Sequence, residues 1–248
     1  MNDLMDLSHR KIMITGASSG IGRAAAILAS EKNASLVLCG RDEGRLNETL
    51  QMLENKERHI LIPFDIRSFD SYNDVFDRAV SDGNKLSGLV HCAGIAKPLP
   101  LRMMKYSRIT ETIETNLSSF ALLVSMYAGK KYSEGGSIVG ISSVNSRLPQ
   151  QYMSVYAASK AGLEAFVRAA SLELCERNIR INCVVPGAVD TPMAQSTDPE
   201  QLEKIIGRQL LGLTDPSEIA NVILFLLSSA SSAITGAAIS ADGGRLGQ

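Results

Sequence analysis

The sequence predicts an α/β fold, in which a doubly wound parallel sheet of about seven strands carries helices on both faces. Short β-rich runs alternate with longer helical runs along the chain. The β-rich runs are continuously apolar, which is typical of strands buried on both faces of a parallel sheet. A length of 248 residues, 45% of them hydrophobic, suits one well-filled core, so we expect a single domain over residues 1–248.

The first half of the chain supplies four strands to this sheet. Apolar runs predict them at residues 12–15, 35–39, 60–64 and 89–93. Helices are expected between them, at residues 20–32, from the cap Asp42 to about residue 53, and at residues 68–79. Asn33 closes the first helix, and Gly94 ends the fourth strand.

The second half continues the alternation. A long helix is expected at residues 106–130, then a strand at 137–141, a helix at 155–176 and a strand at 180–185. After Pro186 the chain enters a loop and helix region that extends to Leu213. The run Asp215-Pro216-Ser217-Glu218 combines a cap, a proline in the first turn and an acid, which predicts a helix start. A last strand is expected at residues 237–240.

Composition argues against several classes of partner. The charges nearly cancel, to a formal net charge of -1 and a pI of about 6.3, and no long Lys/Arg block occurs. We therefore expect neither nucleic acid nor an anionic membrane as a partner. The longest apolar run, residues 222–227, is far shorter than the ~20 residues that cross a bilayer. Residues 1–10 carry acids and lack the apolar core of a signal peptide, so we expect a soluble cytoplasmic protein.

The cysteines also indicate a reducing compartment. Cys39, Cys92, Cys175 and Cys183 are scattered without Cys-x-x-Cys spacing, and three of them fall in apolar, strand-like runs. Buried free thiols are the simplest interpretation, and we expect no metal site.

A glycine-rich turn follows the first predicted strand. The run from Thr15 reads Thr-Gly-Ala-Ser-Ser-Gly-Ile-Gly and ends at Gly22, in the first turn of the helix expected at residues 20–32. Glycines let the backbone turn tightly and approach a pyrophosphate, and the helix offers free N–H groups and its positive dipole end to that anion. The spacing G-x-x-x-G-x-G departs from G-x-G-x-x-G, and a merely tight strand-to-helix connection is the alternative.

A second chemical signature runs from Ser142 to Lys160. Tyr156 and Lys160 are four apart on a predicted helix, so the phenol and the ammonium share one face. A neighbouring cation favours the phenolate and moves its pKa from ~10 toward the working range, which makes the phenol a tunable proton donor. Ser143, thirteen positions before Tyr156, follows an apolar run, where its hydroxyl can donate to a developing alkoxide.

The Tyr-x-x-x-Lys spacing alone is weak evidence. Tyr127 and Lys131 share it, but Glu114 stands thirteen positions earlier, so we interpret that pair as structural. Tyr152 lacks a lysine four positions on. Taken alone, Tyr156 and Lys160 would more often form a solvated pair on a helix surface, so the hypothesis needs support from elsewhere in the chain.

Together these motifs resemble the short-chain dehydrogenase/reductase family over almost the whole chain, and the resemblance implies a Rossmann-like fold. They occur in the order and spacing that the family uses: Thr15-Gly16-x-x-x-Gly20-Ile21-Gly22, Asp65, Cys92-Ala93-Gly94, Asn116, Ser143, Tyr156-x-x-x-Lys160 and Pro186-Gly187. His91 and Cys92 depart from the family's Asn-Asn-Ala-Gly. We expect His91 to be a core histidine satisfied by the backbone, rather than a catalytic one.

The resemblance implies a role for each catalytic candidate. Tyr156 is the acid/base, Lys160 lowers its pKa and holds the nicotinamide ribose, Ser143 polarises the carbonyl, and Asn116 completes a water-linked proton relay. Asn116 as a locally bonded helix residue is the alternative. For Asn182, beside the last strands, a structural role is as plausible as a functional one. The resemblance also divides the domain into a cofactor half, residues 1–115, and a catalytic and substrate half, residues 116–248, with a mobile substrate loop at 190–213.

The same resemblance names the residues expected at the cofactor. They are Gly16, Ser18, Ser19, Gly20, Ile21, Gly22, Arg41, Asp65, Ile66, Ala93, Gly94, Tyr156, Lys160, Pro186, Gly187, Val189 and Thr191. Gly40 stands where NAD-preferring relatives carry Asp, and Arg41 follows it. A guanidinium suits a 2′-phosphate, so NADP(H) is favoured and NAD(H) is the alternative. Asp65 is expected at the adenine amino group, with capping of the turn after a strand as the alternative.

Substrate and partners are inferred from the loops at the carboxyl ends of the strands, residues 95–99, 145–153 and 190–213. Their side chains mix apolar groups with Arg147, Gln150, Gln151 and Arg208, the apolar ones being Leu148, Met153, Met193 and Leu210. The pattern resembles the branch that reduces 3-oxoacyl groups on acyl carrier protein, which implies a 3-oxoacyl thioester substrate. Reduction or oxidation of a sugar, a steroid or another small secondary alcohol is the alternative, and a non-catalytic cofactor-binding regulator is an alternative of another class.

The resemblance also implies two macromolecular partners. Acyl carrier protein is acidic, and Lys97, Arg102, Lys105 and Arg108 are candidates to bind it, with a solvated basic face as the alternative. Family members usually form homotetramers through the long helices, here residues 106–130 and 155–176.

Overall fold

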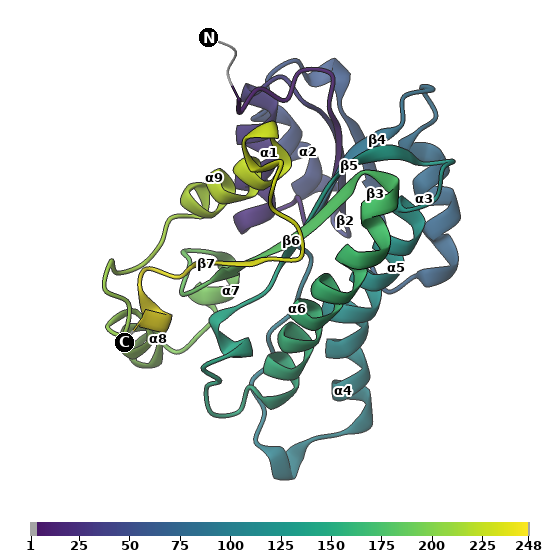
Figure 1. The fold of residues 1–248 in the computed structure, drawn as a ribbon. Helices are drawn as coiled ribbons and strands as arrows, with labels where there is room; N and C mark the ends of the chain where they lie inside the picture. Colours follow the sequence, from purple (N-terminus) through teal and green to yellow (C-terminus); the bar gives the residue numbers. More distant parts are fainter. Residues whose placement is uncertain (1–3, 248) are drawn as a thin grey trace.

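A seven-stranded parallel sheet forms the centre of the structure, a computed structural model that describes residues 4–247 (Figure 1). The strand order is β3-β2-β1-β4-β5-β6-β7, and neighbouring strands are parallel. This arrangement confirms the predicted doubly wound fold class. Residues 1–3 and 248, the ends of the predicted domain, lie outside the described residues. The strands are β1 (Lys11–Thr15), β2 (Ser35–Gly40), β3 (Ile60–Pro63), β4 (Leu86–His91), β5 (Ser133–Ile141), β6 (Ile179–Pro186) and β7 (Ala238–Ala241).

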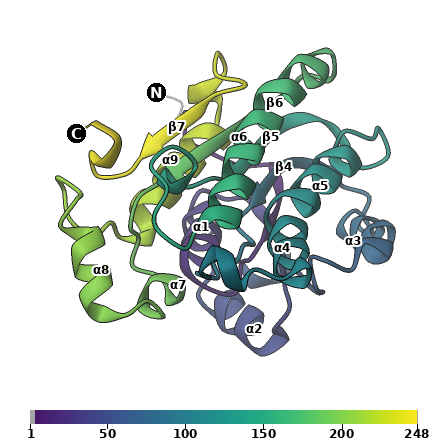
Figure 2. The ribbon, with the colours of Figure 1, turned by 90° about the horizontal axis from the view of Figure 1, so that it is seen from below.

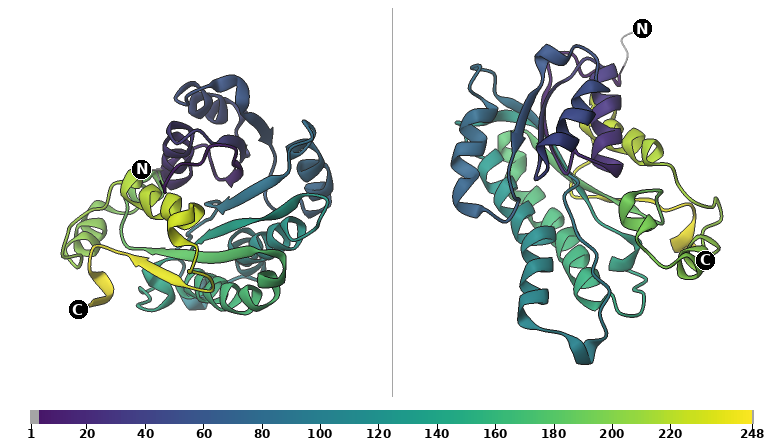
Figure 3. Two further views of the ribbon diagram at one scale, coloured as in Figure 1. Left: turned by 45° about the horizontal axis from the view of Figure 1, so that its top comes forward. Right: turned by 180° about the vertical axis from the view of Figure 1, so that it is seen from behind.

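Helices cover both faces of the sheet, as Figure 3 shows. One face carries α1 (Gly20–Glu31), α2 (Glu43–Gln51) and α9 (Pro216–Leu227). The other carries α3 (Tyr72–Ala79), α4 (Tyr106–Ile113), α5 (Ser119–Tyr127) and α6 (Ser154–Leu174).

Successive residues of a central strand belong to different apolar clusters. Met13 packs with the cluster under α3, α5 and α6, whereas Ile12 and Ile14 pack with the cluster under α1 and α9. All three side chains are at most 1% exposed. Because strand side chains alternate between faces, a strand that is apolar at every position is buried on both sides. This accounts for the continuous apolar runs in the sequence.

Local capping fixes two helix starts as predicted. The Asp42 carboxylate accepts the backbone N–H of Arg45 at 3.0 Å before α2. At α9, Asp215 and Glu218 form a capping box. Other bounds differ by a few residues: β4 begins at Leu86 instead of residue 89, and a short 3₁₀ turn precedes α3.

The helix predicted over residues 106–130 is interrupted. Between α4 and α5 lies a π-helical segment, Glu114–Ser118 (η4), and α5 ends at Tyr127. In a π-segment the backbone hydrogen bonds span five residues instead of four, so the regular 3.6-residue repeat is broken. Such segments are frequent at functional sites. It carries Asn116, whose side chain is fully buried.

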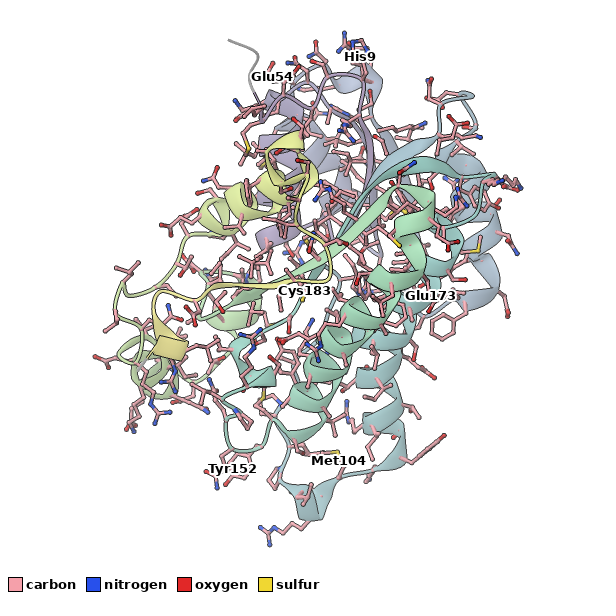
Figure 4. All side chains as sticks on the ribbon, viewed as in Figure 1. His9, Glu54, Met104, Tyr152, Glu173 and Cys183 are labelled. Carbon is pink, nitrogen blue, oxygen red and sulfur yellow. The ribbon has the colours of Figure 1, made fainter. Side chains whose placement is uncertain are left out.

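The carboxyl ends of the strands share one edge of the sheet, which Figure 2 views from below. Two short helices, α7 (Pro192–Gln195) and α8 (Pro199–Ile206), lie at this edge within the region predicted as loop and helix. In Figure 4, Tyr152 and Met104 mark this end of the molecule, and His9 and Glu54 mark the opposite end. Within residues 4–247, no helix combines the length and the apolar character needed to cross a membrane.

Candidate active site

A cleft of about 520 Å³ runs along the carboxyl ends of the strands. Parallel α/β sheets bind ligands at this edge, where the strand order reverses next to β1. All seventeen predicted cofactor residues line it, and so does Ser143. Asn116 does not line the cleft. Segments far apart in sequence are thus brought to a common cavity by the topology of the sheet.

The glycine turn is shaped by close backbone contacts. Gly16 has a φ of +68°, and a Cβ added there would lie 2.7 Å from the backbone nitrogen of Ala93. A Cβ on Gly22 would lie 2.2 Å from the Gly16 carbonyl oxygen. Ser19 begins α1 in extended conformation without a side-chain cap, and the first turn holds no acid. The leading N–H groups of α1 therefore remain available to an anion, which fits a pyrophosphate.

The loop after β6 closes over this turn. A Cβ on Gly20 would lie 3.0 Å from the Thr191 methyl carbon, so the two segments are in direct contact. Gln209, only 6% exposed, braces the loop: its amide accepts from the Ala188 N–H and donates to the Ala188 oxygen at 3.3 Å. The sequence analysis missed Gln209, and no motif in the sequence marks it.

Lys160 reaches the cleft from α6. Lys160 as a residue is 5% exposed, and its ammonium group donates to the Ile141 backbone oxygen at 2.7 Å and lies 5.7 Å from the centre of the Tyr156 ring. Burial lowers the pKa of Lys160 to about 8. The predicted helical pairing of Tyr156 and Lys160 on one face is observed.

Ser143 approaches Tyr156 from the end of β5. Burial raises the pKa of Tyr156, and a hydrogen bond with Ser143 opposes that rise. The net pKa of the Tyr156 phenol is therefore raised, whereas the sequence predicted that it would be lowered. The contribution that opposes the rise comes from Ser143 and not from Lys160. The Ser143 oxygen accepts the Asn145 N–H at 3.2 Å, and the same hydroxyl can still donate its own proton.

Asn116 is bonded to its surroundings. Its amide oxygen accepts the Ile95 N–H at 2.8 Å, and its nitrogen donates to the Ile95 oxygen at 2.9 Å and to the Ser159 hydroxyl at 3.0 Å. The π-segment is therefore attached to the loop after β4 and to α6. A Cβ on Gly94 would lie 3.4 Å from the Asn116 oxygen and 3.5 Å from the Lys160 nitrogen. Asn116 thus lies close to Lys160, next to the cleft.

The last residue of β2 is a glycine and not an acid, and a cation follows it. A Cβ on Gly40 would lie 3.5 Å from the Ser18 hydroxyl, so the glycine turn and the end of β2 meet. Arg41 is exposed and lines the cleft beside them. A hydroxyl and a guanidinium at this corner fit a phosphate on the adenosine ribose.

Asp65 forms the turn contact that the sequence allowed as an alternative. Its carboxylate accepts the Arg67 N–H at 2.9 Å and the Arg67 guanidinium at 3.0 Å. The neighbouring Arg67 lowers the pKa of Asp65. Both side chains line the cleft.

His91 is a core histidine, as predicted, but hydroxyls and not backbone groups satisfy it. Its two ring nitrogens lie 3.0 Å from the Thr15 hydroxyl and 3.5 Å from the Ser119 hydroxyl. The ring is fully buried and stacks on Phe120, with 5.3 Å between centres. Burial lowers the pKa of His91 to about 3, so the ring is neutral. It links β4 to β1 and α5.

Other sequence interpretations are settled by contacts away from the cleft. The second Tyr-x-x-x-Lys pair is structural: Tyr127 donates to the Gly135 oxygen at 2.8 Å, and Lys131 forms an ion pair with Asp77. Asn182 is also structural, since its amide donates to the Ile234 oxygen at 2.9 Å.

The cysteine prediction is partly wrong. All four thiols are free, and Cys39 and Cys183 are buried. Cys92 is half-buried, and Cys175 is exposed because it follows α6 on the surface. We find no group of metal-ligating side chains among residues 4–247.

The substrate end of the cleft differs in part from the sequence expectation. Gln150, Gln151, Met153 and Met193 line it, together with residues that the sequence did not single out, Leu202, Ile205 and Arg245. The other four candidates do not line the cleft: Arg147, Leu148, Arg208 and Leu210. Arg147 instead binds Glu164, with 3.1 Å between the guanidinium and the carboxylate.

A protein-family model described as enoyl-(acyl carrier protein) reductase matches residues 16–245, from the glycine turn to the last 3₁₀ turn. The chain belongs to the short-chain dehydrogenase/reductase family. The family motifs identified in the sequence are those that converge on the cleft, and as a member of this family the protein is an oxidoreductase.

Similar proteins of this family carry different activities. A cis-4-hydroxycyclohexanecarboxylate dehydrogenase of Sinomonas cyclohexanicum is 34% identical over 241 residues, 96% of each chain. A 3-oxoacyl-(acyl-carrier-protein) reductase of Thermotoga maritima is 32% identical, over 97% of this chain and 99% of the relative. A solved structure of a provisionally assigned short-chain alcohol dehydrogenase from Sinorhizobium meliloti superposes with a TM-score of 0.93 at 29% identity, over 99% of this chain and 100% of that one.

Proposed function

We propose that this short-chain dehydrogenase/reductase reduces a ketone to a secondary alcohol with NADPH, using Tyr156 as the acid/base. One observation carries the proposal: Ser143, Tyr156 and Lys160 line the same cleft as the glycine turn. The bound dihydronicotinamide would supply the hydride, and negative charge then builds on the substrate oxygen. A hydrogen-bond donor and a proton donor must converge on that oxygen, and Ser143 and Tyr156 are the pair that does so.

The proposed roles follow from each side chain's surroundings. Ser143 can donate its proton to the carbonyl oxygen while its own oxygen accepts from Asn145. Tyr156 gives its proton to the developing alkoxide. Lys160 holds the nicotinamide ribose and restores the proton of Tyr156, a task that suits an ammonium whose pKa burial has lowered to about 8. Asn116, adjacent to Lys160, serves the proton relay by holding the π-segment and the loop after β4 in place.

NADP(H) is the proposed cofactor, and NAD(H) is the alternative. Support comes from the exposed Arg41 guanidinium, the Ser18 hydroxyl and the absence of an acid at Gly40. The adenine would lie along Asp65 and Ile66, and Val189 and Thr191 would contact the nicotinamide carboxamide.

The proposed substrate class is a 3-oxoacyl thioester. The Thermotoga maritima relative carries that activity in its name, and Met153, Met193, Leu202 and Ile205 give the substrate end an apolar lining suited to an acyl chain. Acyl carrier protein is a proposed partner through Arg102 and Lys105, which are exposed. Lys97 and Arg108 support it less, because both pair with Glu111.

A second candidate is a small secondary alcohol or ketone that bears a carboxylate, such as a ring acid or a sugar acid. The specific observation is Arg245, a half-buried cation that lines the cleft and for which we find no ion-pair partner among residues 4–247. The hydroxycyclohexanecarboxylate dehydrogenase relative acts on such an acid by its name.

We further propose a cytoplasmic homotetramer. Its support is the outward face of α6, where Ala158, Ala161, Ala165 and Leu172 are exposed, the last at 78%. The four free thiols are consistent with a reducing compartment.

The test is to measure the rate of NADPH oxidation in the presence of 3-oxoacyl thioesters, cyclic oxo-acids, ketoses and neutral cyclic ketones. The same panel is measured in parallel with NADH. We expect the highest kcat/KM with a 3-oxoacyl thioester and NADPH. Preference for an oxo-acid, lost selectively in Arg245→Ala, would favour the second candidate instead. If none of the carbonyl compounds in the panel were turned over, the proposed reaction class would be contradicted.

A further inference from the structure

A buried carboxylate lies directly behind the catalytic pair, on the same face of α6. Glu164 follows Lys160 by four residues and Tyr156 by eight, so the three side chains form one stripe along the helix. Glu164 is 6% exposed and does not line the cleft. It cannot touch substrate or cofactor there, and neither the family motifs nor the reaction described above uses it.

Glu164 binds both flanks of Ser143. One carboxylate oxygen accepts the Ser142 hydroxyl at 2.8 Å and also accepts the Ser146 hydroxyl. The other accepts the Arg147 guanidinium at 3.2 and 3.1 Å. Every polar side chain that immediately surrounds Ser143 on this loop, apart from Asn145, is therefore tied to one carboxylate on the catalytic helix.

The loop has further attachments. The Ser142 N–H donates to Val184 on β6 at 2.8 Å, and the Arg147 guanidinium lies 3.5 Å from the Ser240 hydroxyl on β7. These contacts fix the loop to the sheet. On the α6 side, the Ser142 hydroxyl also lies 3.3 Å from the Lys160 backbone oxygen, and the Lys160 ammonium donates to Ile141 at the strand end. Glu164 is the α6 side chain that holds Ser142, Ser146 and Arg147 together.

We propose that Glu164 is a positioning residue that sets the distance and direction between the Ser143 hydroxyl and the Tyr156 phenol. The proposal rests on the proposed function, in which these two groups act on one oxygen. A carboxylate suits this task because it accepts hydrogen bonds from several directions, and charge-assisted bonds to hydroxyls and a guanidinium are short and directional. A displacement of about 1 Å at such a site costs about 100-fold in rate.

Loss of this positioning has a distinctive consequence for the phenol. The hydrogen bond between Ser143 and Tyr156 opposes the effect of burial on the pKa of Tyr156. If the Ser143 hydroxyl moves away, burial is left unopposed and the pKa of Tyr156 rises. A residue that only stabilises the fold would not produce that change. Arg147 from the loop forms an ion pair with Glu164, and the charge of Glu164 helps to raise the pKa of Cys183 on β6. Lys160 and Arg168 are the cations four residues to either side of Glu164 on α6.

The test compares Glu164→Gln with Glu173→Gln, a matched control on the same helix whose carboxylate is exposed (Figure 4). For Glu164→Gln we expect kcat to fall about tenfold or more and the NADPH dissociation constant to stay within about twofold. The pKa of Tyr156, followed by NMR on protein with ¹³C-labelled tyrosine and assigned with Tyr156→Phe, should rise. Glu173→Gln should match the wild type in all three measurements.

A second variant covers the case in which Glu164→Gln folds poorly, since a lost acceptor leaves Arg147 unpaired. The double variant Glu164→Leu/Arg147→Leu removes both charges, and we expect it to fold while showing the same loss of kcat and the same rise in the Tyr156 pKa. An unchanged Tyr156 pKa in the folded variants would overturn the positioning role. Turnover retained in Tyr156→Phe would instead overturn the proposed function, so the two failures are distinguishable.

Discussion

The ammonium group of Lys160 donates a 2.7 Å hydrogen bond to the backbone oxygen of Ile141, the last residue of β5. This bond joins the catalytic helix to the strand end that carries Ser143. Lys160 is a residue only 5% exposed, and burial lowers its pKa to about 8. The structure therefore holds a charge at a cost to stability, as catalytic sites often do.

That cost predicts a pH-dependent stability. In the unfolded chain Lys160 titrates at about 10.5, and in the folded protein at about 8. Between these values the unfolded state binds more protons, so the free energy of unfolding gains a contribution as pH rises from 8 to 10.5. We expect the wild type to gain stability over that range relative to Lys160→Met, measured by urea unfolding. A constant difference across the range would show that Lys160 is not desolvated.

His91 predicts a change of stability in acid. Burial holds its pKa at about 3, against 6.5 in the unfolded chain. As pH falls from 6.5 toward 3, only the unfolded state takes up the proton, so the wild type loses stability, by a few kcal/mol in order of magnitude. His91→Asn keeps a partner for Thr15 without this titration. Its unfolding free energy should therefore fall less steeply over the same range, and an identical slope for the two proteins would contradict a neutral buried His91.

Arg41 predicts the cofactor preference. A guanidinium that bonds a 2′-phosphate contributes about 1.5–3 kcal/mol, so Arg41→Ala should weaken NADPH binding about tenfold or more. NADH lacks that phosphate, and we expect its affinity to change much less. Fluorescence titration of both cofactors measures the effect. Arg45→Ala is the matched control, because it removes an exposed cation nearby that does not line the cleft. Equal losses for both cofactors would remove Arg41 from phosphate recognition.

The sequence predicts those features that depend on local patterns. The capped helix starts at Asp42 and Asp215 are local, since a side chain bonds the backbone two or three residues on. The parallel sheet follows from apolar runs between helices, and the stripe of Tyr156 and Lys160 follows from helical spacing. The convergence of Ser143 on that stripe required knowledge of the family's order of motifs, because thirteen intervening residues fix no geometry by themselves.

Contacts between distant segments could not be read in the same way. The π-segment around Asn116 breaks the helical repeat for a tertiary reason, a two-way bond with Ile95 twenty-one positions earlier. Gln209 braces the loop after β6 from a region with no motif. Glu164 did carry a signal, its position four residues beyond Lys160 on one helix face. Charged residues usually lie in solvent, however, so its burial required the structure.

The proposed reaction depends most directly on the phenol of Tyr156. The decisive measurement is the turnover of Tyr156→Phe with NADPH and the best carbonyl substrate, together with the NADPH dissociation constant of the same variant. Removal of one proton donor should lower kcat by about 100-fold to 10,000-fold, while NADPH binding stays within about twofold of the wild type. Turnover close to that of the wild type, with the cofactor bound, would show that another group moves the proton.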